Sequence, residues 1–183
     1  MTRSITMRTT AEGLRMEAKP RAADDGTAKE LIIDFKIKLS PKARDAHFKK
    51  SLYGVLATRV AKHISVLDGG GRIQNSEGGI NEKEIHSNRA KWCDYSGPIT
   101  CQEWNGLAVF DHPDNPSYPT YWIVRDDGWM CPGVFYASPT TVKKGEEIVI
   151  KHRVYVHKED AEEGNVAERH NEYISHPKMT ITR

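Results

Sequence analysis

The sequence contains no long apolar run. None of its 183 residues lies in a stretch that approaches the roughly 20 apolar residues a membrane-spanning helix requires. The opening MTRSITMRTTAEG is polar and lacks the apolar centre of a secretory signal. We therefore expect a soluble, cytoplasmic protein with no membrane partner.

Cysteine is scarce, and neither sign of charge dominates. Cys93, Cys101 and Cys131 form no CxxC pair, which argues against a zinc ribbon, a thioredoxin-type site and a fully paired disulfide scaffold. The formal net charge is only +2, and the lysines and arginines are scattered among acids. Because nucleic-acid-binding proteins gather positive charge on one face, no nucleic-acid partner is expected.

Common catalytic and phosphate-binding motifs are also missing. The chain has no HExxH, GxSxG or calcium-loop pattern. The three glycines at 69–71 lack the spacing of a dinucleotide-binding loop and the Lys-Ser/Thr pair of a P-loop. They are interpreted as a flexible turn, and the cofactor stays unknown at this point.

The chain does contain strand-like alternation. Residues 31–39 alternate apolar and polar side chains, which predicts a half-buried strand. Residues 148–157 do the same, and one of their faces is expected to meet solvent. Residues 53–64 are a further extended segment. Asn105 and Gly106, between two extended runs, predict a type I′ hairpin turn.

The remaining segments indicate loop and helix. The glycine-rich stretch 67–88 favours a long loop, and residues 165–174 have helical spacing with Asn165 as N-cap. Together the elements predict a mainly β protein, an antiparallel β-sandwich with one short C-terminal helix. We expect a single domain over 1–183, with loose ends at 1–23 and 176–183.

The segment FDHPDNPSYPTYWIVRDDGW, residues 110–129, is the richest in functional side chains. Its three prolines stiffen the connection. His112 titrates near neutral pH and is the best general acid or base, with Asp111 or Asp94 to orient it; the alternative is a structural histidine in a turn. Arg125 can hold a carboxylate or hydroxyls bidentately, or else form an internal bridge to a neighbouring aspartate.

The strings NSEG, RAKWCDYSG, GLAVFDHPDNPSYPTYW and HRVYVH resemble a bacterial family commonly labelled methane oxygenase PmoA. The likeness runs from about residue 24 to about residue 175. The label implies a membrane enzyme, and the chain has neither a spanning segment nor a His-rich copper cluster to match it. The resemblance implies instead a β-rich protein with a galactose-mutarotase-like supersandwich, of which this chain would be the C-terminal part.

The resemblance also implies a set of site residues and a link to carbohydrate metabolism. Ile123 stands where relatives commonly have His, which removes one candidate group. The family's pattern falls on Glu77, Arg89, Asp94, His112, Asn115, Trp122, Arg125 and His157.

Three functions fit these residues. The first is an enzyme that acts on a sugar or oxidised sugar, with His112, Asp111 and Asp94 as catalytic groups and Trp122 stacking on the ring. The second is a non-catalytic carbohydrate-binding or interaction module. The third is metal-assisted hydrolysis by His112, His157 and an acid. The expected partner is a small molecule or carbohydrate, and a homodimer is a further expectation.

Overall fold

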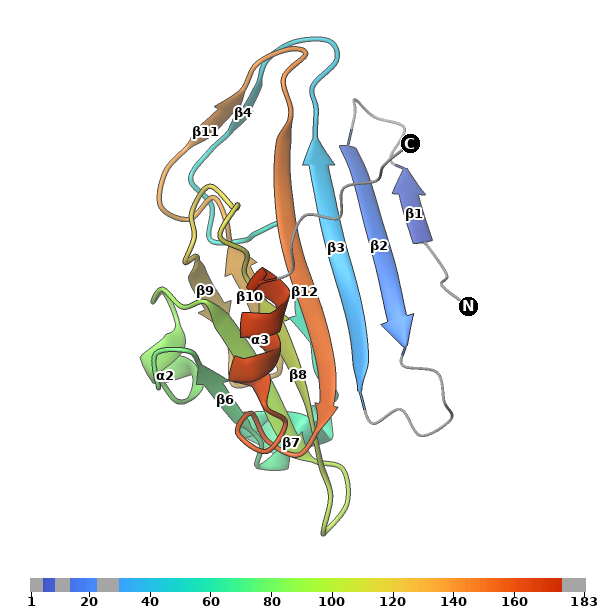
Figure 1. Cartoon of the computed structure of the whole chain (residues 1–183). Helices are drawn as coiled ribbons and strands as arrows, with labels where there is room; N and C mark the ends of the chain where they lie inside the picture. Colours follow the sequence, from blue (N-terminus) through green and yellow to red (C-terminus); the bar gives the residue numbers. More distant parts are fainter. Residues whose placement is uncertain (1–4, 9–13, 23–29, 176–183) are drawn as a thin grey trace.

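The computed structural model describes residues 5–8, 14–22 and 30–175, and strands dominate it (Figure 1). A seven-stranded antiparallel sheet forms the centre of the molecule. In spatial order its strands are β1 (Ile5–Arg8), β2 (Leu14–Ala22), β3 (Leu31–Leu39), β12 (Ile148–Lys158), β8 (Trp104–Phe110), β7 (Trp92–Pro98) and β6 (Arg72–Asn75).

Two smaller antiparallel sheets and several short helices complete the described part. The three-stranded sheet has the order β5 (Thr58–Arg59), β10 (Trp129–Gly133) and β9 (Tyr121–Val124), and β4 (Ala46–Phe48) pairs with β11 (Thr140–Val142). The helices are η1 (Lys62–Ile64), α1 (Val66–Gly69), α2 (Asn81–Ile85) and α3 (Val166–Ser175). No helix in the described ranges is long and apolar enough to cross a membrane.

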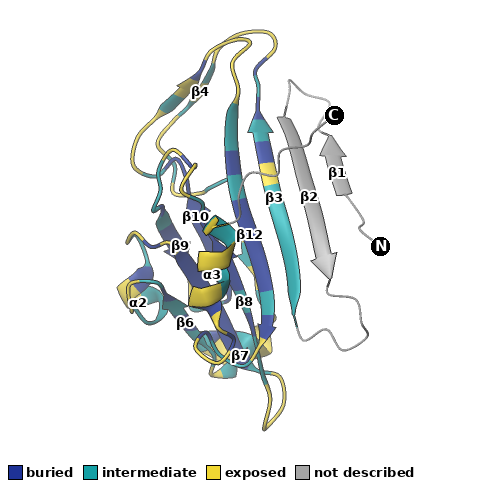
Figure 2. Ribbon diagram, viewed as in Figure 1, coloured by how far each residue is buried: buried dark blue, intermediate teal, exposed yellow. Residues whose placement is uncertain are grey.

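The main sheet is covered on both faces. On one face, Tyr95 and Val109 of the main sheet pack with Trp122 and Met130 of the three-stranded sheet. On the other face, Phe110 and Tyr155 pack with Val166 and Tyr173 of α3. Because side chains alternate along a strand, neighbours in β7, β8 and β12 enter opposite cores. Figure 2 shows these strands as largely buried.

Several sequence predictions are confirmed. The mainly β, antiparallel character is present, the strands at 31–39 and 148–158 form as expected, and α3 begins at Val166. The wet face expected for 148–157 is wrong, however. Arg153, Tyr155 and His157 are buried because α3 and the turn before it cover that face of the sheet, as Figure 1 shows.

The hairpin turn lies elsewhere than predicted. Asn105 and Gly106 lie inside β8, and the turn between β7 and β8 is closed by bonds from the Ile99 and Thr100 amides to the Glu103 carbonyl (2.8 and 3.3 Å). The glycine is required for another reason: a Cβ at Gly106 would overlap the ring of His157.

Three further segments differ from their predicted conformations. The loop predicted for 67–88 contains parts of α1 together with β6 and α2. The extended segment 53–64 contributes only the two residues of β5 before η1. Within the loose end predicted for 1–23, β1 and β2 pair with each other, and β2 pairs with β3. The loose end predicted for 176–183 lies outside the described residues.

Candidate functional site

The proline-rich excursion between β8 and β9 is held together by its own polar side chains. Asp111 is fully buried, and its two carboxylate oxygens accept hydrogen bonds from the Asn115 amide (2.7 Å) and the Thr120 backbone N–H (2.9 Å). Asn115 also exchanges two bonds with the Lys151 backbone. Burial raises the pKa of Asp111 to about 6 despite the donors around it. These groups are scaffold, because their bonding capacity is used within the chain.

His112 points to the α3 side of the main sheet. Its Nδ1 accepts a bond from the Asp114 backbone N–H (3.0 Å), and its ring meets the ring of Tyr173 edge-on. Burial lowers the pKa of His112, and the nearby charge of Lys151 lowers it further. The imidazole is therefore neutral near pH 7.

Asp94 and His157 form a buried pair of their own. His157 Nε2 lies 2.8 Å from Asp94 Oδ1, and Nδ1 donates to the Lys158 carbonyl (2.9 Å). Burial lowers the pKa of His157, but the hydrogen bond and charge of Asp94 outweigh it, so that the pKa is raised. Both side chains are closed off from solvent, and the ring lies against Gly106 and Gly164.

The predicted catalytic group does not assemble. His157 is paired with Gly106 near the start of β8, whereas His112 lies beyond its end, so the strand separates them by about 20 Å. Asp94 therefore orients His157 and not His112. The metal hypothesis required His112 and His157 to bind one ion, and this separation is too large for a shared ion. Among the described residues, no group of three or more His, Cys, Asp or Glu side chains is arranged to hold a metal ion.

The other implied residues have separate surroundings. Trp122 is a core residue whose indole N–H donates to the Ala90 carbonyl (2.9 Å), so it presents no face to a ligand. Arg89 braces the excursion by donating to the Ser117 and Pro119 carbonyls and lies over the Tyr121 ring. Glu77 is exposed and bonded to Ser76.

A groove of about 1040 Å³ lies on the outer face of the three-stranded sheet. Trp122 and Val124 point from β9 into the core, so Ile123 and Arg125 point outward into the groove. Arg125 is the predicted site residue that lines it. The full lining is Leu52, Tyr53, Gly54, Ala57, Arg59, Leu67, Glu82, His86, Ile123, Arg125, Asp126, Asp127, Trp129 and Cys131.

Arg125 and His112 therefore lie on different sides of the molecule. His112 contacts α3, which covers one face of the main sheet, and Arg125 lies beyond the three-stranded sheet that covers the other face. The hypothesis that the excursion aims both groups into one hollow is wrong. Alternation places them on opposite sides, because His112 continues the face of Phe110 while Arg125 shares the outward face of β9.

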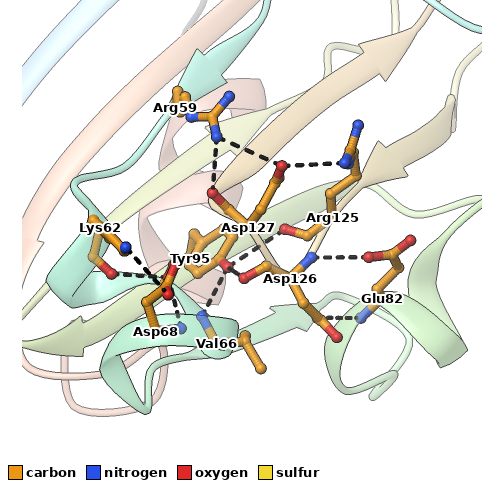
Figure 3. Close-up of polar contacts among 10 residues, drawn as sticks. Arg59, Lys62, Val66, Asp68, Glu82, Tyr95, Arg125, Asp126 and Asp127 are labelled. Atoms are coloured by element: carbon orange, nitrogen blue, oxygen red, sulfur yellow. Dashed lines mark hydrogen bonds and ion pairs between the residues drawn. The ribbon is translucent and has the colours of Figure 1, made fainter.

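Two arginines at one end of the groove share a single carboxylate (Figure 3). Asp127 Oδ2 lies 3.2 Å from Arg125 Nη2 and 3.5 Å from Arg59 Nη2. The side chains of Arg125 and Arg59 are 60% and 59% exposed. Exposed ion pairs contribute only about 0–1 kcal/mol, so a ligand can recruit either guanidinium with little loss of stability.

The backbone beneath these arginines is firmly held. Glu82 and Asp126 exchange bonds in both directions, from the Glu82 N–H to Asp126 Oδ1 (3.1 Å) and from the Asp126 N–H to Glu82 Oε2 (2.9 Å). The Asp126 carbonyl accepts from the Tyr95 hydroxyl (2.9 Å) and the Leu67 N–H (2.9 Å). Figure 3 shows the contacts of Glu82 and Tyr95 converging on the turn at Asp126. A site that is preorganised in this way loses less entropy on binding.

His86 and Trp129 add further polar atoms to the lining. His86 Nδ1 lies 2.8 Å from the Val124 carbonyl, which only accepts, so Nδ1 carries the proton and Nε2 keeps a lone pair in the neutral ring. In the described part of the chain, Trp129 Nε1 and Asp127 Oδ1 are buried atoms with no hydrogen-bond partner. The residues that line the groove thus include polar atoms that the fold leaves unbonded, although those of Trp129 and Asp127 are closed off from solvent.

Sequence reasoning found Arg125 but missed the other lining groups. Arg59 lies in the segment 53–64, for which only an extended conformation was predicted, and Glu82 and His86 lie in the stretch 67–88, which was predicted to be a loop. The available signal was the RDDG turn after β9, since turn residues at a strand end commonly carry sites.

The described residues form a mainly β protein with a polar, arginine-lined groove on a small outer sheet. A family model matches residues 9–171, and the chain belongs to this family of unknown function, DUF6807. That description mentions neither methane oxygenase nor a longer protein. No curated protein and no solved structure matches the chain.

Proposed function

We propose that the groove binds a neutral carbohydrate, with Arg125, Arg59 and Asp127 holding hydroxyl groups. The observation that supports this most is the pair of exposed guanidinium groups on one carboxylate, set on a braced turn. Planar guanidinium and carboxylate groups form paired hydrogen bonds with neighbouring hydroxyls. Trp129 supplies aromatic surface for the apolar C–H face of a sugar.

The charge of the lining favours a neutral sugar over an acidic one. Arg59 and Arg125 face three carboxylates, those of Glu82, Asp126 and Asp127. These two cations and three anions together carry one net negative charge. A uronic acid would add a carboxylate to this field, and like charges repel.

Binding to neutral methyl glycosides and to the matching uronic acids tests the proposal by calorimetry. We expect saturable binding of at least one neutral glycoside and weaker binding of its uronic acid. Arg125→Ala removes charge-assisted bonds worth about 1.5–3 kcal/mol each, so affinity should fall roughly 10- to 100-fold. Arg44→Ala, at an exposed arginine outside the groove, should leave affinity unchanged.

The absence of saturable binding at millimolar sugar, or equal effects of Arg125→Ala and Arg44→Ala, would contradict the proposal. Binding without turnover corresponds to the carbohydrate-binding module predicted from the sequence.

A catalytic role is the second candidate, and the orientation of His86 favours it. With Nδ1–H on the Val124 carbonyl, Nε2 is left as the proton acceptor of a ring that lines the groove. Turnover of a bound sugar that disappears in His86→Gln, while its affinity remains, would establish this role. Unchanged turnover in that variant would exclude His86 as the acid or base.

The resemblance supports a finer account of the fold. We propose that the two packed sheets are the counterpart of part of a galactose-mutarotase-like supersandwich, and that further chain completes it in longer relatives. An experimental structure of a longer family member, superposed on residues 30–175, tests this relation.

A further inference from the structure

The lining of the groove changes from charged to apolar along β9 and β10. Arg125 lies opposite Trp129, and Ile123 lies opposite Cys131 one step further along the sheet. Arg59 is paired with Trp129 as well. Two residues of strand span about 7 Å, so the arginines and the Ile123–Cys131 pair occupy different ends of the groove.

The charged side chains of the lining belong to the Arg125 end. Asp127 bonds both arginines, and Glu82 is tied to Asp126 by the reciprocal pair. The ring of His86 is bonded to the Val124 carbonyl, between the two ends.

The opposite end is apolar. The Gly54 N–H donates to Cys131 Sγ (3.1 Å), and the Ser51 N–H donates to the Phe135 carbonyl (3.1 Å), so the loop between them lies over β10 at this end. Leu52 and Tyr53 project from that loop and are 51% and 62% exposed. Ile123 and Cys131 at this end are themselves buried.

We propose that the ligand of the groove is a glycoside with an apolar alkyl or aryl aglycone. The sugar lies at the Arg125 end, as in the function proposed above on which this inference rests. The aglycone lies against the exposed side chains of Leu52 and Tyr53, at the end of the groove where Ile123 pairs with Cys131. A free sugar would leave this exposed apolar surface in water, whereas an apolar substituent removes it from water and gains affinity.

The size of the effect follows from the transfer energy of a methylene group. Burying one CH₂ group strengthens binding about fourfold. A butyl glycoside should therefore bind at least 10-fold more tightly than the methyl glycoside of the same sugar, even if part of the chain stays exposed.

Calorimetric titration with methyl, butyl and hexyl glycosides of one neutral sugar, each kept below its micelle-forming concentration, measures this gain. Leu52→Ala and Tyr53→Ala should reduce the gain per methylene while the methyl glycoside binds as before. Ile99→Ala, at an exposed apolar residue outside the lining, is the matched control and should leave the gain intact. Leu67→Ala is a second control within the lining. The Leu67 backbone is bonded to Asp126 at the Arg125 end, so this variant should leave the gain per methylene intact.

The outcomes separate the two proposals. Equal affinity for the three glycosides, with binding that still depends on Arg125, overturns the aglycone proposal and leaves the sugar-binding function standing. A gain that survives in Leu52→Ala and Tyr53→Ala also overturns it. No binding of any glycoside, or 1-hexanol binding as tightly as the hexyl glycoside, overturns the sugar-binding function and this inference with it.

Discussion

The excursion at 111–120 and the groove lined from 123 to 131 are neighbours in sequence and contain similar polar residues, but they differ in exposure. The carboxylate of Asp111 is fully buried with both oxygens bonded to the chain. The carboxylate of Asp127 is 27% exposed and holds two arginines that are mostly in solvent. Residue type therefore does not separate scaffold from site here. What separates them is whether the fold already uses each group's bonding capacity.

The largest expected effect is that of Asp111→Ala on stability. The substitution removes the acceptor of the Thr120 N–H and of one Asn115 amide hydrogen. Each buried unsatisfied group costs about 1–3 kcal/mol, so we expect the free energy of unfolding to fall by about 3 kcal/mol in chemical denaturation. Asp127→Ala should cost less than about 1 kcal/mol. Equal losses in the two variants would remove the distinction between excursion and groove.

A second test addresses the buried pair of Asp94 and His157. Gly106→Ala places a methyl group against the His157 ring, and overpacking of this kind costs about 1–3 kcal/mol. Thermal or chemical unfolding measures the loss. Combined with His157→Ala, which makes room for the methyl group, the two changes should be less than additive. Full additivity would show that Gly106 is required by something other than the ring.

The sequence predicted the elements whose pattern is local. Alternation at 31–39 and 148–157 and helical spacing at 165–174 depend on neighbouring residues. The corresponding elements form as Leu31–Leu39, Ile148–Lys158 and Val166–Ser175. The local pattern could not show that α3 covers the second face of β12. That contact depends on the path of the turn between the strand and the helix, which alternation and helical spacing do not determine. The buried state of Tyr155 follows from that contact, and the ring of His157 lies against Gly164 in the turn just before α3.

Of the charged and imidazole side chains that line the groove, the sequence predicted Arg125 alone, and it missed the others for a related reason. Arg125 was found because it follows a recognisable strand. Arg59, Glu82 and His86 come from segments far apart in sequence and meet only when β5 and α2 come to lie beside β9 and β10. Conversely, His112 was predicted as an acid or base and Trp122 as a stacking residue. In the structure, His112 contacts α3 and Trp122 packs in the core.

A smaller effect concerns pH. The pKa of His157 is raised in the folded protein above its unfolded value near 6.5. A raised pKa means that the protonated form is stabilised by folding, so this contribution is complete below about pH 6.5 and is lost as the pH rises through the folded pKa. The free energy of unfolding measured across this range should fall with pH. Asp94→Asn removes the charge that raises the pKa and should flatten the dependence, and an unchanged profile would contradict this assignment.

The smallest expected effect on stability is that of Arg125→Ala, and it is the sharpest test of the comparison. The Arg125–Asp127 pair is exposed at 3.2 Å, and Asp127 keeps Arg59 as a second partner. We therefore expect a change in the free energy of unfolding below about 1 kcal/mol. The same variant should lose sugar affinity by 10-fold or more. A residue that serves the scaffold would show the reverse, a large loss of stability with binding changed only in proportion to the unfolded fraction. Measuring both quantities on one preparation therefore decides whether the groove is a site or merely another braced turn.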